Sequence, residues 1–478
     1  MREQMKKYKL LLLAALLIKP ILSQAEDQIR IAIGTQDTTI NCAAGGAVVR
    51  ELHLLEKYLP HDGRYKQAHY DVIWHNFTSG PPLNSELLAD KLDIGNMADF
   101  PAVLGASAFQ ASNNGVRTYY IATLSGSVTG AGNAVVVPTS SPIQSFSALK
   151  GKRISVPMGS TAHAMLLRAI FDQGWDPERD VTIVSQAPEV AGSALKANQI
   201  DAHADFVPFG ELFPFRGIAR KIYDGSASGV TTTHGIQVRS DFAEKYPELV
   251  IAYLRATLEA DRLIREKPED LCEKLAQWTG VEPEVCYAFH GPWGIQTRDF
   301  SLKPEFINAI RQAEITLRQL KKTSQPLDVD SFVNDRFIRE AAKESGIDYA
   351  ARLKDYTPVP FTGDAEDTGA PISEPRLAGQ IWIKGEAKVR LFSTPEAALA
   401  AARKEESEGK AIRVVYVHDR QSGVKLFADK AWYVNQGGKL AAFLLRRSAD
   451  DWASKHGGAV SDYKDAQRAV DPALSAKK

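Results

Sequence analysis

The sequence of 478 residues has no excess of charge of either sign, and it lacks the short motifs of several common enzyme classes. Its 58 basic residues balance 58 acidic ones, so little drives binding to phosphate backbones and no nucleic-acid partner is expected. Gly-x-x-x-x-Gly-Lys-Ser/Thr, His-Glu-x-x-His and Cys-x-x-Cys are all missing, and we therefore do not expect an enzyme. The 44% of apolar and 24% of charged residues exclude a wholly disordered chain and a multi-span membrane protein.

The N-terminal segment has the features of an export signal. Met1–Lys9 carries four basic residues and one acid, and the apolar run Leu10–Ile18 that follows is too short to span a bilayer. Small residues, Ser23 and Ala25, then stand at the positions that precede cleavage. We therefore predict that residues 1–25 are a secretory signal peptide.

Cysteine is scarce, with three in the whole chain. Cys272 and Cys286 flank a turn between two helical patterns, so a disulfide between them could join a helical hairpin in an exported protein. Cys42 would then remain as a small buried residue rather than a reactive thiol.

Strands alternate with helices from about residue 27 to residue 355, a pattern that predicts parallel α/β architecture. The segment 356–375 is rich in proline, glycine and acids and has no periodicity, which predicts a linker. Residues 376–470 then predict a small α+β domain with helices at 394–404 and 448–456. Residues 471–478 are expected to fray.

Several loops occupy the place where open α/β sheets bind ligands. This place lies beyond the carboxyl ends of the strands, where free N–H groups of helix N-termini favour anions. Each loop alone could be an ordinary helix cap, but several loops that face one cleft would form a site. The residues predicted to bind ligand are Thr35, Gln36, Asp37, Ser79, Gly80, Met97, Asp99, Ser125, Ser160, Thr161, His163, His203, Asp205 and His234.

This set is compatible with more than one ligand chemistry. Helix N-termini with Ser79, Ser160 and Thr161 suit a small anion. The histidines and aspartates of the set could instead hold a cationic ligand or a metal, whereas neutral histidines would be hydrogen-bonding walls. Asp99 and Asp205 argue against a pocket that selects anions alone.

Four segments resemble the substrate-binding proteins of ABC importers in the nitrate/taurine/alkanesulfonate group. The segments are Leu83–Pro101 (LNSELLADKLDIGNMADFP), Leu149–Ile170, Ile200–Gly225 and Arg239–Ala256. The resemblance implies a type II periplasmic-binding fold in which two lobes close on a ligand about a hinge. Lobe 1 would comprise residues 26–132 and 235–355, and lobe 2 residues 133–234. It also implies a periplasmic monomer that captures nitrate, a sulfonate or a related small anion and delivers it to a permease at the inner membrane.

The C-terminal domain resembles the NosL family of copper chaperones that assist nitrous oxide reductase. The resemblance lies in Gly379–Ala402, Ile412–Asp419, Asp429–Val434 and Trp452–Tyr463. That family holds Cu(I) through soft ligands that include a Cys-Gly-Met motif, yet no cysteine or methionine occurs here after Cys286. His418 and His456 are the remaining candidate metal ligands. An alternative function is therefore copper binding or delivery by this domain and the cleft histidines, with copper as the one cofactor considered.

Overall fold

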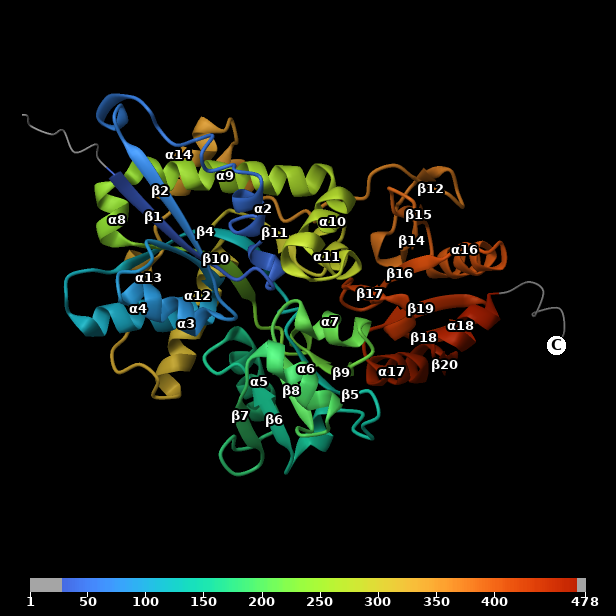
Figure 1. Cartoon of the computed structure of the whole chain (residues 1–478). Coiled ribbons are helices and arrows are strands. Elements are labelled where there is room, and N and C mark those ends of the chain that lie inside the picture. Colours follow the sequence, from blue (N-terminus) through green and yellow to red (C-terminus); the bar gives the residue numbers. More distant parts are fainter. Residues whose placement is uncertain (1–27, 471–478) are drawn as a thin grey trace, which may run out of the picture.

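The computed structural model describes residues 28–470, which form two α/β lobes and a C-terminal domain (Figure 1). The predicted signal peptide and the predicted frayed tail lie outside the described residues. No helix in residues 28–470 combines the length and the apolar character that a membrane crossing requires.

Lobe 1 is built on a six-stranded sheet of order β11-β4-β10-β3-β1-β2. β1 pairs in parallel with β2 and β3, whereas β10 is antiparallel to both β3 and β4. The carboxyl ends of the parallel strands therefore share one edge of the sheet. The strands are β1 (Gln28–Thr35), β2 (His69–Asn76), β3 (Ile94–Ala98), β4 (Thr118–Ser127), β10 (Thr232–Arg239) and β11 (Thr297–Arg298).

Helices cover this sheet, and four of them have proline as their first residue, where its missing N–H breaks no helical hydrogen bond. The helices are α2 (Ala47–Glu51), α3 (Gly80–Leu88), α4 (Asp99–Ser112), α8 (Ser240–Lys245), α9 (Pro247–Glu266), α10 (Pro268–Thr279), α11 (Pro283–His290), α12 (Pro304–Gln319), α13 (Val329–Phe332), α14 (Arg336–Glu344) and α15 (Tyr349–Arg352), with short 3-10 turns η1 (Ile40–Cys42) and η2 (Gly63–Tyr65).

Lobe 2 repeats the design on a five-stranded sheet of order β7-β6-β8-β5-β9. β6 is parallel to β7 and β8, and β5 is antiparallel to β8 and β9. The elements are β5 (Ala134–Pro138), η3 (Phe146–Leu149), β6 (Arg153–Val156), α5 (Thr161–Asp172), β7 (Thr182–Ser185), α6 (Pro188–Lys196), β8 (Ala202–Asp205), α7 (Phe209–Phe215), β9 (Ala219–Asp224) and η4 (Gly225–Ala227).

The chain crosses between the lobes twice, at 128–133 and at 225–231. The crossings lie backbone to backbone, because a Cβ added to Gly130 or Gly225 would collide with the carbonyl of the other glycine. Gly130 also has φ +85°, a conformation that favours glycine. β10 begins at Thr232, so His234 lies in the sheet of lobe 1. The boundary expected from the sequence, after residue 234, placed it in lobe 2.

The C-terminal domain has two small antiparallel sheets, β15-β14-β16-β17 and β19-β18-β20, and its predicted helices are confirmed as α16 and α17. The segment predicted as a linker contains the short pair β12–β13, which periodicity could not reveal. The elements are β12 (Asp364–Ala365), β13 (Ala370–Pro371), η5 (Pro375–Leu377), β14 (Gly379–Ile383), β15 (Arg390–Phe392), α16 (Pro395–Ser407), β16 (Ile412–His418), β17 (Lys425–Phe427), η6 (Ala428–Lys430), β18 (Trp432–Gln436), β19 (Lys439–Phe443), α17 (Arg446–His456), β20 (Ala459–Ser461) and α18 (Tyr463–Ala469).

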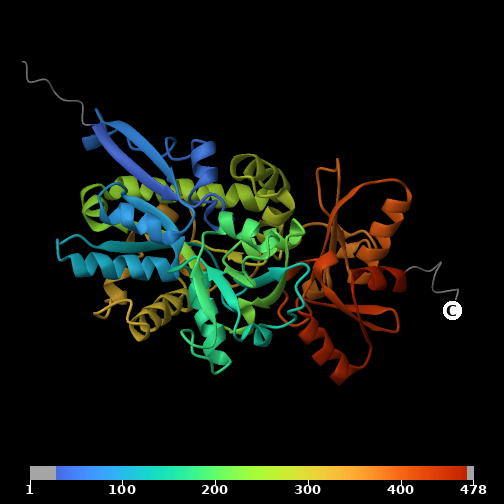
Figure 2. The same cartoon turned by 60° about the horizontal axis from the view of Figure 1, so that its bottom comes forward.

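The C-terminal domain lies beside both lobes, which both views show (Figures 1 and 2). One buried apolar cluster extends from the lobes into this domain through Tyr287 of α11, Trp382 of β14 and Tyr416 of β16. A second, small cluster around Phe443 belongs to the domain alone.

Cys272 and Cys286 are buried, free thiols on α10 and α11, so the structure does not contain the disulfide that the sequence allowed. Cys42 is also buried, as expected, and burial raises the pKa of its thiol to about 12. A thiol with so high a pKa is a poor nucleophile at neutral pH.

Candidate functional site

The fourteen residues predicted to bind ligand come from both lobes, and all of them are buried. In lobe 1 they follow strands or lie on β1, β3, β4 and β10, and in lobe 2 they lie at the start of α5 and on β8. Gly159 of lobe 2 lies against lobe 1, since a Cβ added to it would be 3.2 Å from Cγ of Pro81. The two lobes therefore contact each other along this interlobe face.

Thr35 is the last residue of β1, Gln36 and Asp37 follow it, and neighbours from lobe 1 hold all three. The Thr35 hydroxyl donates to Oδ1 of Asp37 at 2.7 Å, and Nε2 of Gln36 donates to the Asn96 carbonyl at 2.9 Å. Arg50 of α2 pairs with Oδ2 of Asp37 at 2.9 Å. The charge of Asp37 is thus already neutralised within the protein.

A polar link runs from lobe 1 to the first crossing, through two residues that sequence reasoning missed. Nδ2 of Asn41 donates to Oε1 of Gln296 at 2.5 Å, and Nε2 of Gln296 donates to the Ala131 carbonyl at 2.7 Å. Asn41 also lies 3.4 Å from Nδ1 of His234, and its carbonyl accepts from Ser125 Oγ at 3.5 Å. His234 and Ser125 of the predicted set are therefore brought together. The one signal in the sequence was an asparagine between two apolar residues.

Asp99 begins α4 and is a buried carboxyl group without a cationic partner. Its oxygens accept backbone N–H groups of Phe100 at 2.7 Å and of Thr233 at 3.1 Å. Within the described residues no lysine, arginine or histidine lowers its pKa, and burial raises that pKa to about 7. At neutral pH a large part of the molecules therefore carry Asp99 in the neutral form, which can donate a hydrogen bond.

Ser160 and His163 organise the start of α5 in lobe 2. Ser160 caps the helix, since its Oγ accepts the backbone N–H of His163 at 3.3 Å. The His163 ring turns back, and its Nδ1 accepts from the N–H of Gly159 at 3.3 Å. Thr161, in the first turn, contributes a buried hydroxyl.

His203 and Asp205 face each other within the sheet of lobe 2. Hydrogen bonds of 2.7 Å join His203 to Ser155 on one side and to Asp205 on the other. This order resembles a serine–histidine–aspartate triad, but Ser155 and His203 have no exposed surface. A substrate cannot reach the Ser155 hydroxyl, so the network fixes the position of Asp205 and is not a catalytic triad in this conformation.

Two histidines of the interlobe face are uncharged at neutral pH, because burial lowers their pKa. Burial lowers the pKa of His163 and of His234 to about 4. Among residues 28–470 no group of three or more histidine, cysteine and acidic side chains could hold a metal ion. The geometry therefore favours histidines that act as hydrogen-bonding walls.

Two cavities open at the interlobe face. One, of 320 Å³, is lined by Asp99 and Thr161 of the predicted set, together with α12 and the crossing 225–231. The other, of 330 Å³, is lined by Thr38 of lobe 1, by α6 and α7 of lobe 2, and by the turn between α10 and α11. Both volumes are typical of sites for small molecules.

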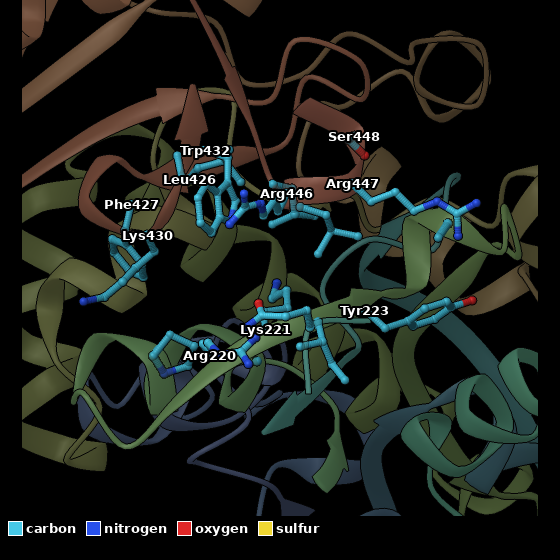
Figure 3. A pocket seen from close by; sticks show the side chains of 18 of the residues that line it. Arg220, Lys221, Tyr223, Leu426, Phe427, Lys430, Trp432, Arg446, Arg447 and Ser448 are labelled. Carbon is cyan, nitrogen blue, oxygen red and sulfur yellow. The ribbon is translucent and has the colours of Figure 1, made fainter. Parts of the chain in front are cut away.

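A larger cavity, of 510 Å³, lies between lobe 2 and the C-terminal domain (Figure 3). Sequence reasoning did not predict it, because its walls come from segments more than 200 residues apart in the chain.

The two histidines proposed as metal ligands in the C-terminal domain have separate surroundings. His418 is buried, its Nδ1 lies 2.9 Å from the Ala378 carbonyl, and burial lowers its pKa to about 3. His456 is exposed and stacks on Trp452 with ring centres 4.0 Å apart. Copper binding by these residues gains no support from their positions.

Comparisons with known proteins bear on the two lobes. Residues 98–271 match the profile of the family described as NMT1/THI5 like. A Bacillus subtilis (strain 168) relative, provisionally named as an aliphatic sulfonates-binding protein, is 25% identical over 57% of this chain and 79% of its own length. The taurine-binding periplasmic protein of Escherichia coli (strain K12) is 28% identical over 45% of this chain and 66% of its own length.

Among solved structures, the alkanesulfonate-binding protein SsuA from Xanthomonas axonopodis pv. citri, bound to MOPS, matches with a TM-score of 0.53. It is 23% identical, and the match covers 65% of this chain and all of that protein. The desulfurization enzyme DSZB matches with a TM-score of 0.50 at 13% identity, so the fold also occurs in an enzyme. Residues 98–271 are thus similar to the NMT1/THI5-like family, and the two lobes have the fold of type II periplasmic binding proteins, to which a further domain is attached.

Proposed function

We propose that the two lobes bind a small organosulfonate, of the alkanesulfonate or taurine class, at the interlobe face. The protein would act in the periplasm as a monomer that hands this ligand to an ABC permease at the inner membrane. The observation that carries the proposal is the similarity of this chain to relatives named for aliphatic sulfonate and taurine binding, over 57% and 45% of its length.

The chemistry of the interlobe face supports an anionic ligand held by neutral donors. The N-terminus of α5 offers free N–H groups and the Thr161 hydroxyl, and the positive end of the helix dipole favours an anion there. Asp99, which lines the same 320 Å³ cavity, is a donor in its neutral form. A sulfonate presents three oxygen acceptors to such groups, and the one cationic side chain that lines this cavity, Arg168, is paired with Asp172 at 2.8 Å.

A sulfonate is favoured over nitrate, because the two relatives are named for the binding of aliphatic sulfonates and of taurine. Copper handling, the alternative that the sequence allowed, has no group of candidate ligands to support it in the described part of the chain. Catalysis is not part of the proposal, since the buried Ser155–His203–Asp205 network is closed to a substrate.

The test is a thermal shift and calorimetric titration of the mature protein with ethanesulfonate, taurine and nitrate. A sulfonate present at 100 times its Kd should stabilise the folded state by about 2.7 kcal/mol. Thr161→Val removes one hydroxyl at the start of α5 and should weaken sulfonate binding about tenfold. Thr182→Val, on the exposed side of β7, is the matched control and should leave binding unchanged.

Two results would overturn the proposal. The first is a folded protein that none of these sulfonates stabilises. The second is stabilisation by nitrate alone, which would leave a solute-binding role but contradict the ligand class.

A further inference from the structure

An ion pair joins the two lobes directly at the end of α7. Arg216 follows this helix of lobe 2, and Glu282 precedes α11 of lobe 1. Nε of Arg216 donates to Oε1 of Glu282 at 2.7 Å, and Nη2 donates to Oε2 at 3.0 Å. Such a two-point contact fixes the orientation of both side chains and is stronger than a single hydrogen bond between neutral groups.

A third hydrogen bond strengthens this contact. Nη2 of Arg216 also donates to the Gly280 carbonyl at 2.9 Å. Gly280 ends α10 with φ +74°, a conformation that favours glycine and lets the chain turn towards α11. The turn between α10 and α11 therefore presents a backbone carbonyl and the Glu282 carboxylate to the same guanidinium.

Water reaches both side chains of this ion pair only in part. The side chain of Arg216 is 37% exposed and that of Glu282 is 32% exposed. Exposed pairs contribute little, whereas a pair with two-point geometry and reduced exposure contributes more. Lobe 2 offers a comparison, because Arg179 pairs with Asp176 at 2.8 Å while its side chain is 78% exposed.

The lobe 1 half of the contact is held in place by the C-terminal domain. Arg413 of that domain pairs with Glu273 of α10 and, at 2.7 Å, with Glu284 of α11. The Tyr416 hydroxyl donates to the Glu284 carbonyl at 2.7 Å. Both helices that flank the turn are therefore anchored on the side away from lobe 2. Separation of the lobes breaks the bonds of Arg216, because the anchored turn cannot follow lobe 2.

The lobe 2 half of the contact is anchored as well. The backbone N–H of Arg216 donates to the Leu212 carbonyl at 3.0 Å, which continues the turns of α7. Phe213 is buried beneath the same end of the helix, and a Cβ added to Gly192 of α6 would be 3.1 Å from its ring. α7 lies against α11 of lobe 1 (Figure 1). The two charged groups are thus presented to each other by rigid elements.

The contact lies apart from the two crossings that connect the lobes. The 330 Å³ cavity beside it is lined by Arg216 and Gly280 and by no residue of 128–133 or 225–231. The 320 Å³ cavity, in contrast, is bordered by the crossing 225–231. A rotation about the crossings therefore moves Arg216 relative to Glu282. The three hydrogen bonds are lost once donor and acceptor separate by about 1 Å more.

We propose that Arg216, Glu282 and the Gly280 carbonyl form a latch that holds the two lobes in contact and has to open before the lobes separate. The latch goes beyond the function proposed above, because it acts on the lobes with or without a solute. One consequence rests on that function: the apparent affinity for a solute falls in proportion to the fraction of molecules whose lobes are joined.

The test measures single-molecule energy transfer between two dyes, one on each lobe. Thr182→Cys in lobe 2 and Asn114→Cys in lobe 1 supply exposed attachment points, while the native cysteines are buried. Without ligand, Arg216→Gln should raise the ratio of separated to joined molecules at least threefold. The matched control Arg179→Gln breaks a pair within lobe 2 and should leave the ratio unchanged.

A charge swap tests whether the ion pair itself is responsible. Glu282→Arg alone should raise the ratio as Arg216→Gln does. Arg216→Glu combined with Glu282→Arg rebuilds the pair with its charges exchanged and should bring the ratio back towards that of the wild type. Sodium chloride at about 1 M should narrow the difference between the wild type and Arg216→Gln, because salt screens the pair.

Unchanged ratios in both single variants contradict the latch, as does a charge-swapped protein that is as open as either single variant. Calorimetric titration with ethanesulfonate keeps this outcome apart from that of the proposed function. Where both proposals hold, Arg216→Gln weakens ethanesulfonate binding, and Arg179→Gln does not. A protein that binds no sulfonate but separates its lobes in Arg216→Gln supports the latch and contradicts only the proposed function.

Discussion

The C-terminal domain meets the two lobes in different ways. Towards lobe 1 the contact is packed: Tyr287 of α11 lies 5.5 Å, ring centre to ring centre, from both Trp382 and Tyr416. Ion pairs join Arg413 of this domain to Glu284 at 2.7 Å and to Glu273. Towards lobe 2 the same domain encloses the 510 Å³ cavity, here named the interdomain cavity, which Ala288 and Ile295 of lobe 1 also line, and the Phe215–Phe427 ring contact of 5.2 Å lies on this side.

This difference indicates which parts of the molecule move together. Packed rings and half-buried ion pairs hold the C-terminal domain to lobe 1 as one body. Lobe 2 is joined to that body by two crossings and a hollow interface, so a hinge rotation of lobe 2 costs few contacts of the C-terminal domain. Such a rotation would change the shape of the interdomain cavity along with that of the interlobe face.

Replacement of one aromatic ring on each contact gives the sharpest test of the difference. Tyr287→Ala removes a fully packed ring and should lower the free energy of unfolding by about 3–5 kcal/mol, the usual range for such truncations in cores. Calorimetry should then resolve a separate transition for the C-terminal domain. Phe215→Ala, on the lobe 2 side and half-buried, should cost about 1 kcal/mol and leave one transition. Equal losses for the two variants would contradict the comparison.

The ion pairs give a second, smaller difference. Arg413→Met leaves Glu284 without its partner at the contact with lobe 1 and should cost about 2 kcal/mol in urea denaturation. Arg447→Met, on the side that faces lobe 2, breaks only an exposed pair of 3.9 Å with Asp451 within α17 and should cost less than about 0.5 kcal/mol. Both variants remove an arginine of the same domain, so their ratio compares an ion pair that joins this domain to lobe 1 with one that lies within a single helix. A ratio near one would indicate that the pair with Glu284 adds nothing to the contact with lobe 1.

The sequence could predict the order of strands and helices well, because local periodicity and proline positions carry that information. Helices α16 and α17 were predicted within a few residues of their observed bounds, and proline begins several helices of lobe 1. The position of His234 in the sheet of lobe 1 could not be predicted from the sequence. β10 begins within the run TTTH, which has no alternation of apolar residues to mark the start of a strand.

The candidate site was predictable only in outline, because strand ends give the edge of a sheet but not the partner of each side chain. Asp37 is neutralised by Arg50 across thirteen residues, a pairing that spacing does not reveal. The role of Asn41 depends on Gln296, more than 200 residues away. The interdomain cavity requires the docking of two domains, which no local pattern contains.

The pH dependence of stability gives a test of Lys425, which is buried at the centre of the contact. Its pKa is about 7 in the folded protein and about 10.5 in an unfolded chain, so the unfolded state binds more protons between these values. Its penalty to stability is therefore complete below pH 7 and disappears as the pH rises towards 10.5. Lys425→Met should stabilise the protein by up to about 4 kcal/mol at pH 6 and by less than about 1 kcal/mol at pH 10. Urea denaturation at the two pH values measures this, and Lys439→Met, exposed, should show no gain at either.

The interlobe face contains a buried group whose pKa is shifted in the opposite direction. The pKa of Asp99 is raised, whereas that of Lys425 is lowered. An unfolded aspartate titrates near pH 4 and Asp99 near pH 7, so the folded state holds this proton more tightly. The stabilisation is complete below pH 4 and is lost as the pH rises through 7. Under the proposed function, ionised Asp99 would also repel the bound sulfonate, so affinity should fall severalfold between pH 6 and pH 8.5. Asp99→Asn keeps the shape without the charge and should bind sulfonate equally at both values in calorimetric titration. If the affinity of Asp99→Asn fell with pH as steeply as that of the wild type, Asp99 would not be beside the ligand, and the 320 Å³ cavity would not be the sulfonate site.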